Sequence, residues 1–240
     1  IVGEAEAEAV HRVICEDGYL GIGKEVQQFE ADVAAYLGVP VSWVISVNTG
    51  TAALHLAVEA VLGHGSGAEV LVPSLTFVAS FQAIGRGRGR PCGLRCALDT
   101  ATIDLADAES ALPPAPRPSC RYTTRATRSI WTVCMRLRKS TACGSSKMPP
   151  MRSDACTRAA RSAASGDVAC FSFDGIKNIT CGEGGCIVTS DQPWPKPRAT
   201  GVCFPWKRTP KAFLRNSAAG SSTVERQGWR YHMSNVMAAI

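Results

Sequence analysis

Lys177 is the residue of this 240-residue chain that is best placed for covalent chemistry. It stands in the stretch FSFDGIKN, where the preceding apolar run is typical of a buried strand and a glycine-rich turn follows. A lysine near the end of a buried strand can lose its proton and act as an amine nucleophile. Most lysines in such positions simply reach solvent, so Lys177 alone does not separate a nucleophile from a surface charge.

A second candidate is the turn Asn48-Thr49-Gly50-Thr51, which connects an apolar run to a helical run. Backbone N–H groups at the start of a helix, together with a hydroxyl, suit the binding of a phosphate group. The same residues are also typical of an ordinary helix N-cap with a glycine turn, and the turn by itself favours that second interpretation.

Ser172 and Phe77 are weaker candidates of the same kind. Ser172 stands five residues before Lys177 and can offer its hydroxyl to the same phosphate, although it is equally an ordinary strand serine. Phe77 opens a predicted helix and can stack on a flat ring. An aromatic residue in that place is more often part of the core.

The elements that must position these residues alternate between strand and helix. Strands are expected at 41–47, 69–72, 168–173 and 186–189, and helices at 4–15, 26–37, 52–63 and 77–84. Gly38 ends the second helix, and the chain closes in a further helical run. Repeated strand, turn and helix predict an α/β fold with a parallel sheet.

The net charge of +6 is unevenly distributed. Residues 1–85 hold ten acidic and two basic residues, a balance of −8, whereas residues 113–165 hold eleven basic residues and one acidic residue, a balance of +10. A block of this kind is typical of a nucleic-acid or membrane-surface patch, or of a solvated insert. No sustained period of two or 3.6 residues runs through 113–165 or through 192–226, and the regular order breaks at Gly85.

Composition excludes several classes of protein. No apolar run approaches the ~20 residues of a membrane helix, and the first residues are acidic where a signal peptide is basic and then apolar. The 11 cysteines include no C-x-x-C pair, so neither a disulfide scaffold nor a zinc site is favoured. We therefore expect a cytoplasmic protein with no metal site and no membrane partner.

Five blocks together resemble the DegT/StrS family of pyridoxal-phosphate sugar aminotransferases. In family order they are GYLGIGKEVQQFEADVAAYLGV, VNTGTAALHLAV, VLVPSLTFVASFQAIG, GDVACFSFDGIKNITCGEGGCIVTSD and GWRYHMSNVMAAI. The FSFxxxKNxTxGEGG string is the most specific of these. The resemblance implies an α/β fold, the large domain of a type I pyridoxal-phosphate-dependent transferase with a mainly parallel sheet. Residues 1–240 would be an incomplete large domain, without the smaller C-terminal domain.

The resemblance also implies roles for the candidate residues. Lys177 would bind pyridoxal phosphate covalently and later move a proton between substrate and cofactor. Gly50 and Thr51 would hold the phosphate, with the hydroxyl of Ser172. Phe77 would stack on the pyridine ring.

The last of the five blocks implies a dimer. The GWRYHMSN stretch would place His232 across the interface of a homodimer, near the phosphate of the partner. The implied reaction is transfer of an amino group, with glutamate as donor, to a nucleotide-linked keto sugar. That chemistry belongs to surface-polysaccharide, O-antigen or lipopolysaccharide biosynthesis.

One element of the family is absent from the chain as printed. The acidic motif E-D-x-A-H, whose Asp keeps the pyridinium nitrogen protonated, should precede Lys177 and is missing, and the irregular block 113–165 stands in its place. When residues 145–156 are translated one base out of frame, the codons allow VVEDAAHAFGC. We interpret residues 86–97, 113–165 and 192–226 as displaced reading frames, which would also explain the basic charge and seven of the 11 cysteines.

The residues as printed also support a second hypothesis. A catalytically inactive family fragment would act as a basic binding protein and bind nucleic acid through the arginine-rich block. That block has only Tyr122 and Trp131 as aromatic residues and no recognisable nucleic-acid-binding motif. We therefore favour the aminotransferase, with no nucleic-acid partner.

Overall fold

The computed structural model of the protein describes residues 2–62, 68–99, 103–111, 168–177, 179–190 and 229–240. It also gives the backbone of three short strands, β4 (Tyr122–Thr123), β5 (Arg125–Ala126) and β6 (Val133–Cys134). Most of the block 113–165 and all of 192–226 lie outside the described residues. The prediction that those segments lack a regular period therefore stays a prediction.

The helices and strands follow the predicted order. The helices are α1 (Glu4–His11), the π-helix η1 (Arg12–Asp17), α2 (Lys24–Leu37), the 3-10 helix η2 (Val41–Trp43), α3 (Gly50–Leu62), α4 (Ala79–Arg86), α5 (Leu105–Ser110) and α7 (Asn235–Ala239). The longer strands are β1 (Val44–Val47), β2 (Glu69–Pro73), β3 (Arg90–Leu94), β7 (Val168–Ser172) and β8 (Gly185–Thr189).

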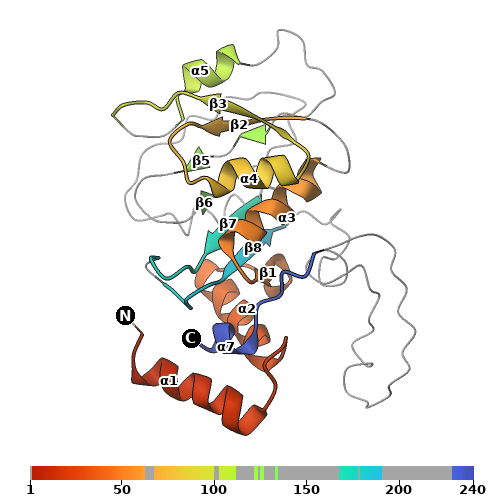
Figure 1. The fold of residues 1–240 in the computed structure, drawn as a ribbon, viewed down its shortest axis with the longest axis vertical. Helices are drawn as coiled ribbons and strands as arrows, with labels where there is room; N and C mark the ends of the chain where they lie inside the picture. Colours follow the sequence, from red (N-terminus) through yellow and green to blue (C-terminus); the bar gives the residue numbers. More distant parts are fainter. Residues whose placement is uncertain are drawn as a thin grey trace, which may run out of the picture.

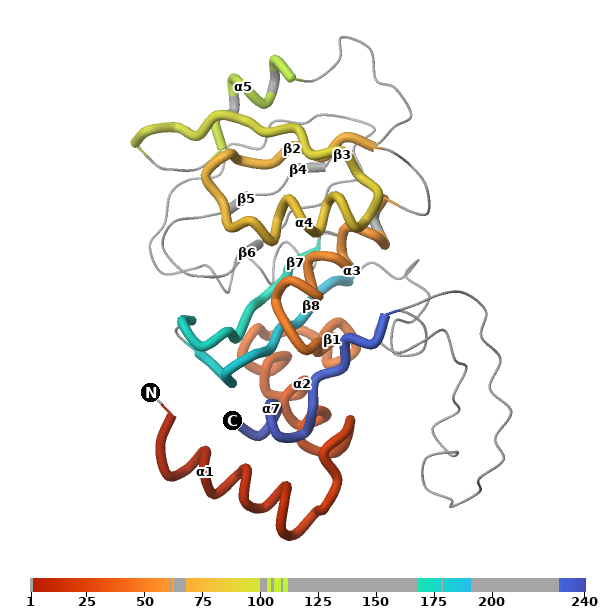
Figure 2. The backbone as a smooth tube through the Cα atoms, in the orientation of Figure 1, coloured from red at the N-terminus to blue at the C-terminus, as the bar shows by residue number. Residues whose placement is uncertain are grey.

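These elements form an α/β structure with two main sheets, ordered β1–β8–β7 and β3–β2–β4. Figures 1 and 2 show α3 and α4 side by side, with β2 and β3 on one side of the pair and the β1–β8–β7 sheet on the other. Among the described residues, parallel pairing is confined to β3–β2–β4. Strand β8 runs antiparallel to β7 because the two are the arms of one hairpin, and it also runs antiparallel to β1.

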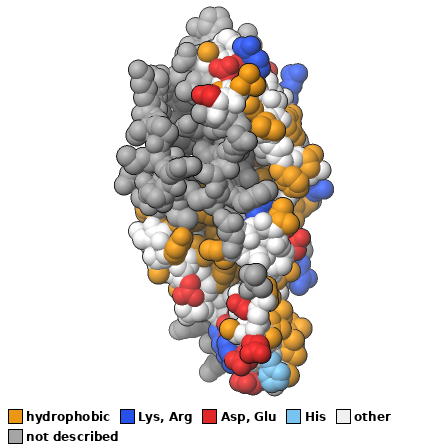
Figure 3. Space-filling view, turned by 90° about the vertical axis from the view of Figure 1, so that its left-hand side faces the viewer, with side chains coloured by type: hydrophobic (Ala, Val, Ile, Leu, Met, Phe, Trp, Pro, Cys, Tyr) orange, Lys and Arg blue, Asp and Glu red, His pale blue; other side chains and the backbone are white. Residues whose placement is uncertain are grey.

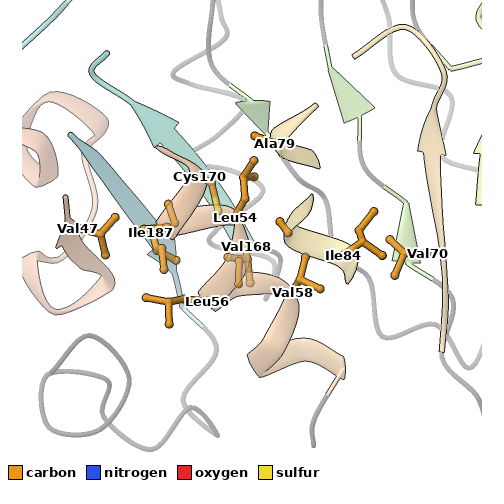
Figure 4. Close-up of a cluster of buried hydrophobic side chains, with 14 of the residues drawn as sticks. Val47, Leu54, Leu56, Val58, Val70, Ala79, Ile84, Val168, Cys170 and Ile187 are labelled. Carbon is orange, nitrogen blue, oxygen red and sulfur yellow. The ribbon is translucent and has the colours of Figure 1, made fainter. Parts of the chain in front are cut away.

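The β1–β8–β7 sheet is buried on both faces, as the nearly continuous apolar runs of its strands indicate. One face packs against α3 and the other against α2. The side chains on the α3 face are Ile45, Val47, Val168, Cys170 and Ile187. Those on the α2 face are Val44, Ala169, Phe171, Cys186 and Val188. Figure 4 shows the first set meeting Leu54, Leu56 and Val58 of α3.

Helix α2 also covers the open edge of β1. The Ser46 N–H and the Ser46 hydroxyl both donate to Glu30 Oε1, at 3.1 and 3.0 Å. Buried backbone groups without a partner are costly, so this carboxylate completes the edge of the sheet. Helix α2 ends where predicted, at Gly38, whose φ of 67° lies in the left-handed region that glycine favours.

Several predicted boundaries are wrong by a few residues. Helices α2 and α3 each begin two residues earlier than predicted, at Lys24 and Gly50. The first helix ends at His11 and continues as the π-helix η1. The strand expected from residue 41 begins at Val44, because residues 41–43 form a 3-10 turn in which Trp43 N–H donates to the Pro40 carbonyl at 3.0 Å. Helix α4 begins at Ala79, so Phe77 precedes it.

Regular structure also continues past Gly85, where the sequence predicts a break. Helix α4 extends to Arg86, and β3 pairs in parallel with β2 from Arg90 to Leu94. Among the described strands, β3 pairs with β2 alone and lies at the edge of its sheet, a position that tolerates the missing N–H of Pro91. Only Leu94 of this strand is buried, so backbone pairing rather than apolar patterning holds it in place.

In the part of the chain that the structure describes, no helix has the length and apolar character needed to cross a membrane. The six cysteines within the described ranges are all free thiols. The same ranges hold no group of three or more His, Cys, Asp or Glu side chains arranged to bind a metal ion.

Candidate cofactor site

The start of α3 combines a capped helix with open backbone donors. Thr49 is the N-cap residue: its Oγ1 accepts the Ala52 N–H at 3.0 Å, and its carbonyl accepts the Ala53 N–H at 3.1 Å. Within the described residues, the N–H groups of Gly50 and Thr51 make no hydrogen bond. The two interpretations of this turn are therefore compatible, because the cap leaves two donors at the positive end of the helix dipole.

Gly50 lies directly against Ser172 at the end of β7. A Cβ at position 50 would stand 2.6 Å from Ser172 Cβ and 2.7 Å from Ser172 Oγ. Only glycine fits this approach, and the approach brings the serine hydroxyl to the start of α3. The structure thus joins two of the predicted phosphate-binding residues, although they are more than 100 residues apart in the sequence.

Gly185 closes the same turn from the neighbouring strand, and the sequence prediction omitted it. A Cβ there would lie 2.5 Å from the Thr49 carbonyl oxygen and 2.8 Å from the Gly50 nitrogen. In the sheet, Gly185 pairs with Val47 on one side and with Ser172 on the other. The signal in the sequence was a pair of glycines entering a buried strand, which marks a close backbone approach.

Lys177 lies in the hairpin loop between β7 and β8, five residues beyond Ser172. The loop is closed at its base, where the Phe173 N–H donates to the Gly184 carbonyl at 2.9 Å. Lys177 N–H donates to the Asp174 carbonyl at 2.9 Å, and the lysine is half-buried. Lys177 therefore lies on an ordered hairpin loop that follows directly from β7, the strand that ends at Ser172.

The thiol of Cys181, in the same hairpin, is a poor rival as nucleophile. Burial raises the pKa of Cys181 to about 11, with a smaller contribution in the same direction from Glu183. The Cys181 Sγ lies 3.0 Å from the Glu183 carbonyl oxygen. Because the thiolate is the reactive form, Cys181 is inert near neutral pH.

Phe77 lies on the surface, so the alternative that it belongs to the core is wrong. Its side chain is 70% exposed, in the turn between β2 and α4. The carbonyl of Phe77 accepts the Ser80 N–H at 3.0 Å, and the hydroxyls of Thr76 and Ser80 lie 3.1 Å apart. The turn is thus ordered, and the exposed ring of Phe77 is available to an external group.

His232 is half-buried in the segment that leads into α7. Burial lowers the pKa of His232 below 6.5, and Arg230 lowers it further. The neighbouring Tyr231 carbonyl accepts the Asn48 N–H at 2.9 Å, so this segment crosses the start of α3 in its own chain. A contact from His232 to a partner's phosphate stays a prediction.

Asn48 adds an unexpected polar group at this crossing. Its Oδ1 is buried and has no hydrogen-bond partner among the described residues. Buried polar atoms are nearly always paired, so an unpaired one beside a candidate site indicates room for a further donor.

A buried histidine on α3 was not predicted to matter. His55 is 1% exposed, and its Nδ1 lies 3.1 Å from the Tyr231 hydroxyl. Its ring centroid lies 5.1 Å from that of Trp229, whose Nε1 donates to Glu59 Oε2 at 2.9 Å. Sequence alone shows only a histidine on an apolar helix. In the structure, the side chains of Trp229 and Tyr231 pack against it.

We expect acid to destabilise the protein through His55. Burial is the main effect that lowers the pKa of His55 below its ordinary value of 6.5; Arg86 acts in the same direction and Glu59 opposes it. Below that value the unfolded chain binds more protons than the folded chain, so the free energy of unfolding should fall as the pH drops. His232, with its pKa shifted in the same direction, adds to the effect.

Urea unfolding measured at about pH 7.5 and about pH 5.5 tests this expectation. His55→Gln should reduce the difference between the two free energies, whereas the same replacement at the exposed His11 should leave it as in the wild type. A His55→Gln difference equal to that of the wild type would contradict the assignment.

Solved structures share this arrangement of elements. The aminotransferase TlmJ from Streptoalloteichus hindustanus superposes with a TM-score of 0.68 at 27% sequence identity, covering 100% of this chain and 62% of that one. The sugar aminotransferase CalS13 from Micromonospora echinospora superposes with a TM-score of 0.73 at 22% identity, covering 100% and 64%, and supports the fold alone. The fold is therefore of the aminotransferase class, which confirms the α/β prediction.

The chain belongs to the DegT/DnrJ/EryC1/StrS aminotransferase family, which it matches over residues 1–117 and 154–240. It is 31% identical over 201 residues to dTDP-4-dehydro-2,3,6-trideoxy-D-glucose 4-aminotransferase of Saccharopolyspora spinosa, covering 80% of this chain and 49% of the relative. It is 32% identical over 170 residues to GDP-perosamine synthase of Caulobacter vibrioides, covering 71% and 45%. The chain spans about half the length of these curated relatives.

The comparisons confirm the predicted family. A solved structure that shares the fold, a GDP-4-keto-6-deoxymannose-3-dehydratase, holds a PLP–glutamate adduct. The family match omits residues 118–153, which lie inside the block predicted to be out of frame. It includes the two other segments so interpreted, 86–97 and 192–226. The position expected for the acidic motif before Lys177 lies outside the described residues.

Proposed function

We propose that this chain holds the pyridoxal phosphate of an aminotransferase that transfers an amino group to a nucleotide-linked keto sugar. The observation that carries the proposal is the contact between Gly50 and Ser172, with Lys177 on the hairpin that begins at Ser172. The names of the relatives, which act on dTDP-linked and GDP-linked sugars, support the substrate class.

The residues present suit a phosphate-bearing cofactor. Gly50 approaches Ser172 so closely that a Cβ at position 50 would collide with it, and this contact holds the Ser172 hydroxyl beside two N–H groups that make no hydrogen bond within the described residues. In the proposal, Gly50, Thr51 and the Ser172 hydroxyl hold the phosphate, and the exposed Phe77 lies against the ring. Lys177 supplies the amine that attaches the cofactor and then holds or moves the substrate proton. Pyridoxal phosphate, when bound, supplies the electron sink.

The amino donor and the setting are further parts of the proposal. Glutamate donates the nitrogen, and the product serves surface-polysaccharide biosynthesis, of the O-antigen or lipopolysaccharide kind, in the cytoplasm. The test is an assay of keto-acid release from glutamate in the presence of dTDP-linked or GDP-linked keto sugars. The assay uses the chain with its reading frame restored, because the chain as printed is expected to turn over little. Keto acid released beyond one equivalent per enzyme, and only when one of these sugars is present, supports the proposal. If neither sugar gives release beyond one equivalent, the proposal is contradicted.

We also propose a homodimer in which His232 reaches the partner's phosphate. Exposed apolar side chains flank both candidate segments: Leu75 and Val78 beside Phe77, and Ile176 and Ile179 beside Lys177. Figure 3 shows hydrophobic side chains open to solvent over much of the described surface. Large exposed apolar areas mark interaction sites. Sedimentation equilibrium should give a dimer, and a monomer at all concentrations would contradict this part.

For the residues as printed, we expect cofactor binding with little turnover. The Asp that keeps the pyridinium nitrogen charged is missing from the sequence before Lys177, and without that charge the ring is a poor electron sink. We propose that residues 1–240 are a pyridoxal-phosphate-binding large domain in which 86–97, 113–165 and 192–226 are translated out of frame. The omission of 118–153 from the family match supports this for the middle segment.

Resequencing of the gene tests the displaced frames. Compensating single-base insertions or deletions are expected near the boundaries of the three segments, and the restored chain should turn over where the printed chain does not. Codons that fail to spell the acidic motif one base away would refute the idea. Colourless protein that retards DNA in a salt-sensitive manner would instead support the basic binding protein.

A further inference from the structure

Residues 229–235, here called the strap, pass over the candidate cofactor site in an extended path and contact it twice. The Tyr231 carbonyl accepts the Asn48 N–H at 2.9 Å, directly before the α3 turn. The buried Met233 packs at Gly184, where an added Cβ would lie 3.0 Å from the Met233 Cε. One contact is to the predicted phosphate turn and the other is to the hairpin of Lys177.

The strap is anchored at both ends. At its start, Trp229 and Tyr231 stack on one another and pack against the buried His55, and Trp229 Nε1 donates to Glu59. At its end stands Asn235, which is 2% exposed and opens α7. Asn235 is therefore the anchor that fixes the strap on the side away from α3.

Asn235 reaches back to the glycine-rich connector at residues 18–23, more than 200 residues away in the sequence. Its Oδ1 accepts the Gly23 N–H at 2.9 Å and its Nδ2 donates to the Tyr19 carbonyl at 3.0 Å. Its own N–H donates to the carbonyls of Leu20 and Gly21, at 3.2 and 3.1 Å. One side chain and one backbone amide thus hold the whole connector.

Asn235 also takes the place of a missing helix cap. Helix α2 has Gly23 as its N-cap residue and no side-chain cap of its own, and Asn235 Oδ1 accepts N–H groups of both Gly23 and Val26. A side chain at position 23 would collide with Asn235 Nδ2, so glycine is required there. Asn235 thus occupies the space that a side chain at position 23 would need and accepts the Gly23 N–H; we call the two residues the Gly23–Asn235 pair.

We propose that Asn235 is a positioning residue for the cofactor site. The Gly23–Asn235 pair fixes one end of the strap and so keeps the strap in contact with Asn48 and Gly184. This rests on the proposed function. Loss of the Asn235 side chain frees one end of the strap, and the Tyr231–Asn48 hydrogen bond and the packing of Met233 at Gly184 then loosen. The phosphate turn loses its fixed geometry although none of its own residues has changed.

Asn235→Ala is expected to weaken the binding of pyridoxal phosphate about tenfold, which equals about 1.4 kcal/mol. Backbone amide exchange should rise both at residues 18–26 and at residues 48–53. Asn235→Asp keeps the acceptor for Gly23 and Val26 but sets a carboxylate oxygen against the Tyr19 carbonyl, so it should raise exchange at residues 18–22 while the start of α2 stays capped.

Ser234→Ala is the matched control. Ser234 Oγ accepts the Met237 N–H at 3.2 Å and so caps α7, but it makes none of the bonds of Asn235. This variant should raise exchange only at residues 235–240 and leave cofactor affinity as in the wild type. If Asn235→Ala behaves like Ser234→Ala, the positioning role is refuted.

A double-mutant cycle tests the pair. Gly23→Ala should weaken binding in the wild type but have a much smaller effect in the Asn235→Ala background, because the group it collides with is gone. Equal effects in both backgrounds would overturn the proposal. If the wild-type chain binds no pyridoxal phosphate, the proposed function fails instead, and exchange at residues 48–53 in Asn235→Ala decides the strap separately.

Discussion

Replacement of Lys177 by alanine is expected to abolish covalent attachment of pyridoxal phosphate, and with it the yellow colour of the purified protein. The residue lies on an ordered hairpin beside Ser172, and its amine is the group to which we assign the attachment. Any amino transfer that the chain supports should fall by about 10²–10⁴-fold from the loss of the proton transfer alone. Visible absorbance and the keto-acid assay measure the two effects.

Two further variants make the test specific. Lys177→Arg keeps the positive charge but cannot lose a proton, so it should behave like Lys177→Ala. Lys24→Arg changes an exposed lysine that pairs with Asp17 at 2.7 Å, and it should keep the colour of the wild type. If Lys177→Ala keeps the yellow colour of the wild type, Lys177 is not the residue that attaches the cofactor.

Gly185→Ala is the substitution expected to disturb the phosphate turn most. The new Cβ would lie 2.5 Å from the Thr49 carbonyl oxygen and 2.8 Å from the Gly50 nitrogen, and both of these are backbone atoms that cannot turn aside. Overpacking of this kind costs about 1–3 kcal/mol of the free energy of unfolding. Cofactor affinity should fall as well, because the start of α3 must move.

Gly85→Ala on α4 is the control for that experiment. A Cβ there meets no atom of the described residues within 4 Å, so the change should be neutral or stabilising by about 0.4–1 kcal/mol. Denaturant unfolding with and without pyridoxal phosphate separates the loss of stability from the loss of binding. Gly185→Ala with the stability and affinity of the wild type would show that the turn is not held as the structure has it.

The sequence predicted most strands and helices well because local pattern determines them. The nearly continuous apolar runs of β1, β7 and β8 and the glycine at position 38, which takes a left-handed conformation, are local signals. The boundary errors arose where a turn competed with the pattern, as at Pro40, or where a helix continued with a different hydrogen bond, as in η1.

The residues of the candidate site fall into two groups: those that a local sequence pattern indicates and those that only the structure shows. Residue types at the ends of predicted elements indicated Gly50, Ser172 and Lys177. The roles of Gly185, His55 and Asn235 come from contacts between segments that are far apart in the chain. No local pattern encodes such contacts, and a lone glycine, histidine or asparagine is ambiguous until its neighbours are known.

Borohydride reduction of the protein with pyridoxal phosphate, followed by mass mapping of its peptides, is the decisive test of Lys177 as the attachment site. Reduction makes the bond between lysine and cofactor permanent, so the modified peptide identifies that site. We expect the cofactor on the peptide that contains Lys177. A cofactor found on another lysine, or on none, would contradict it.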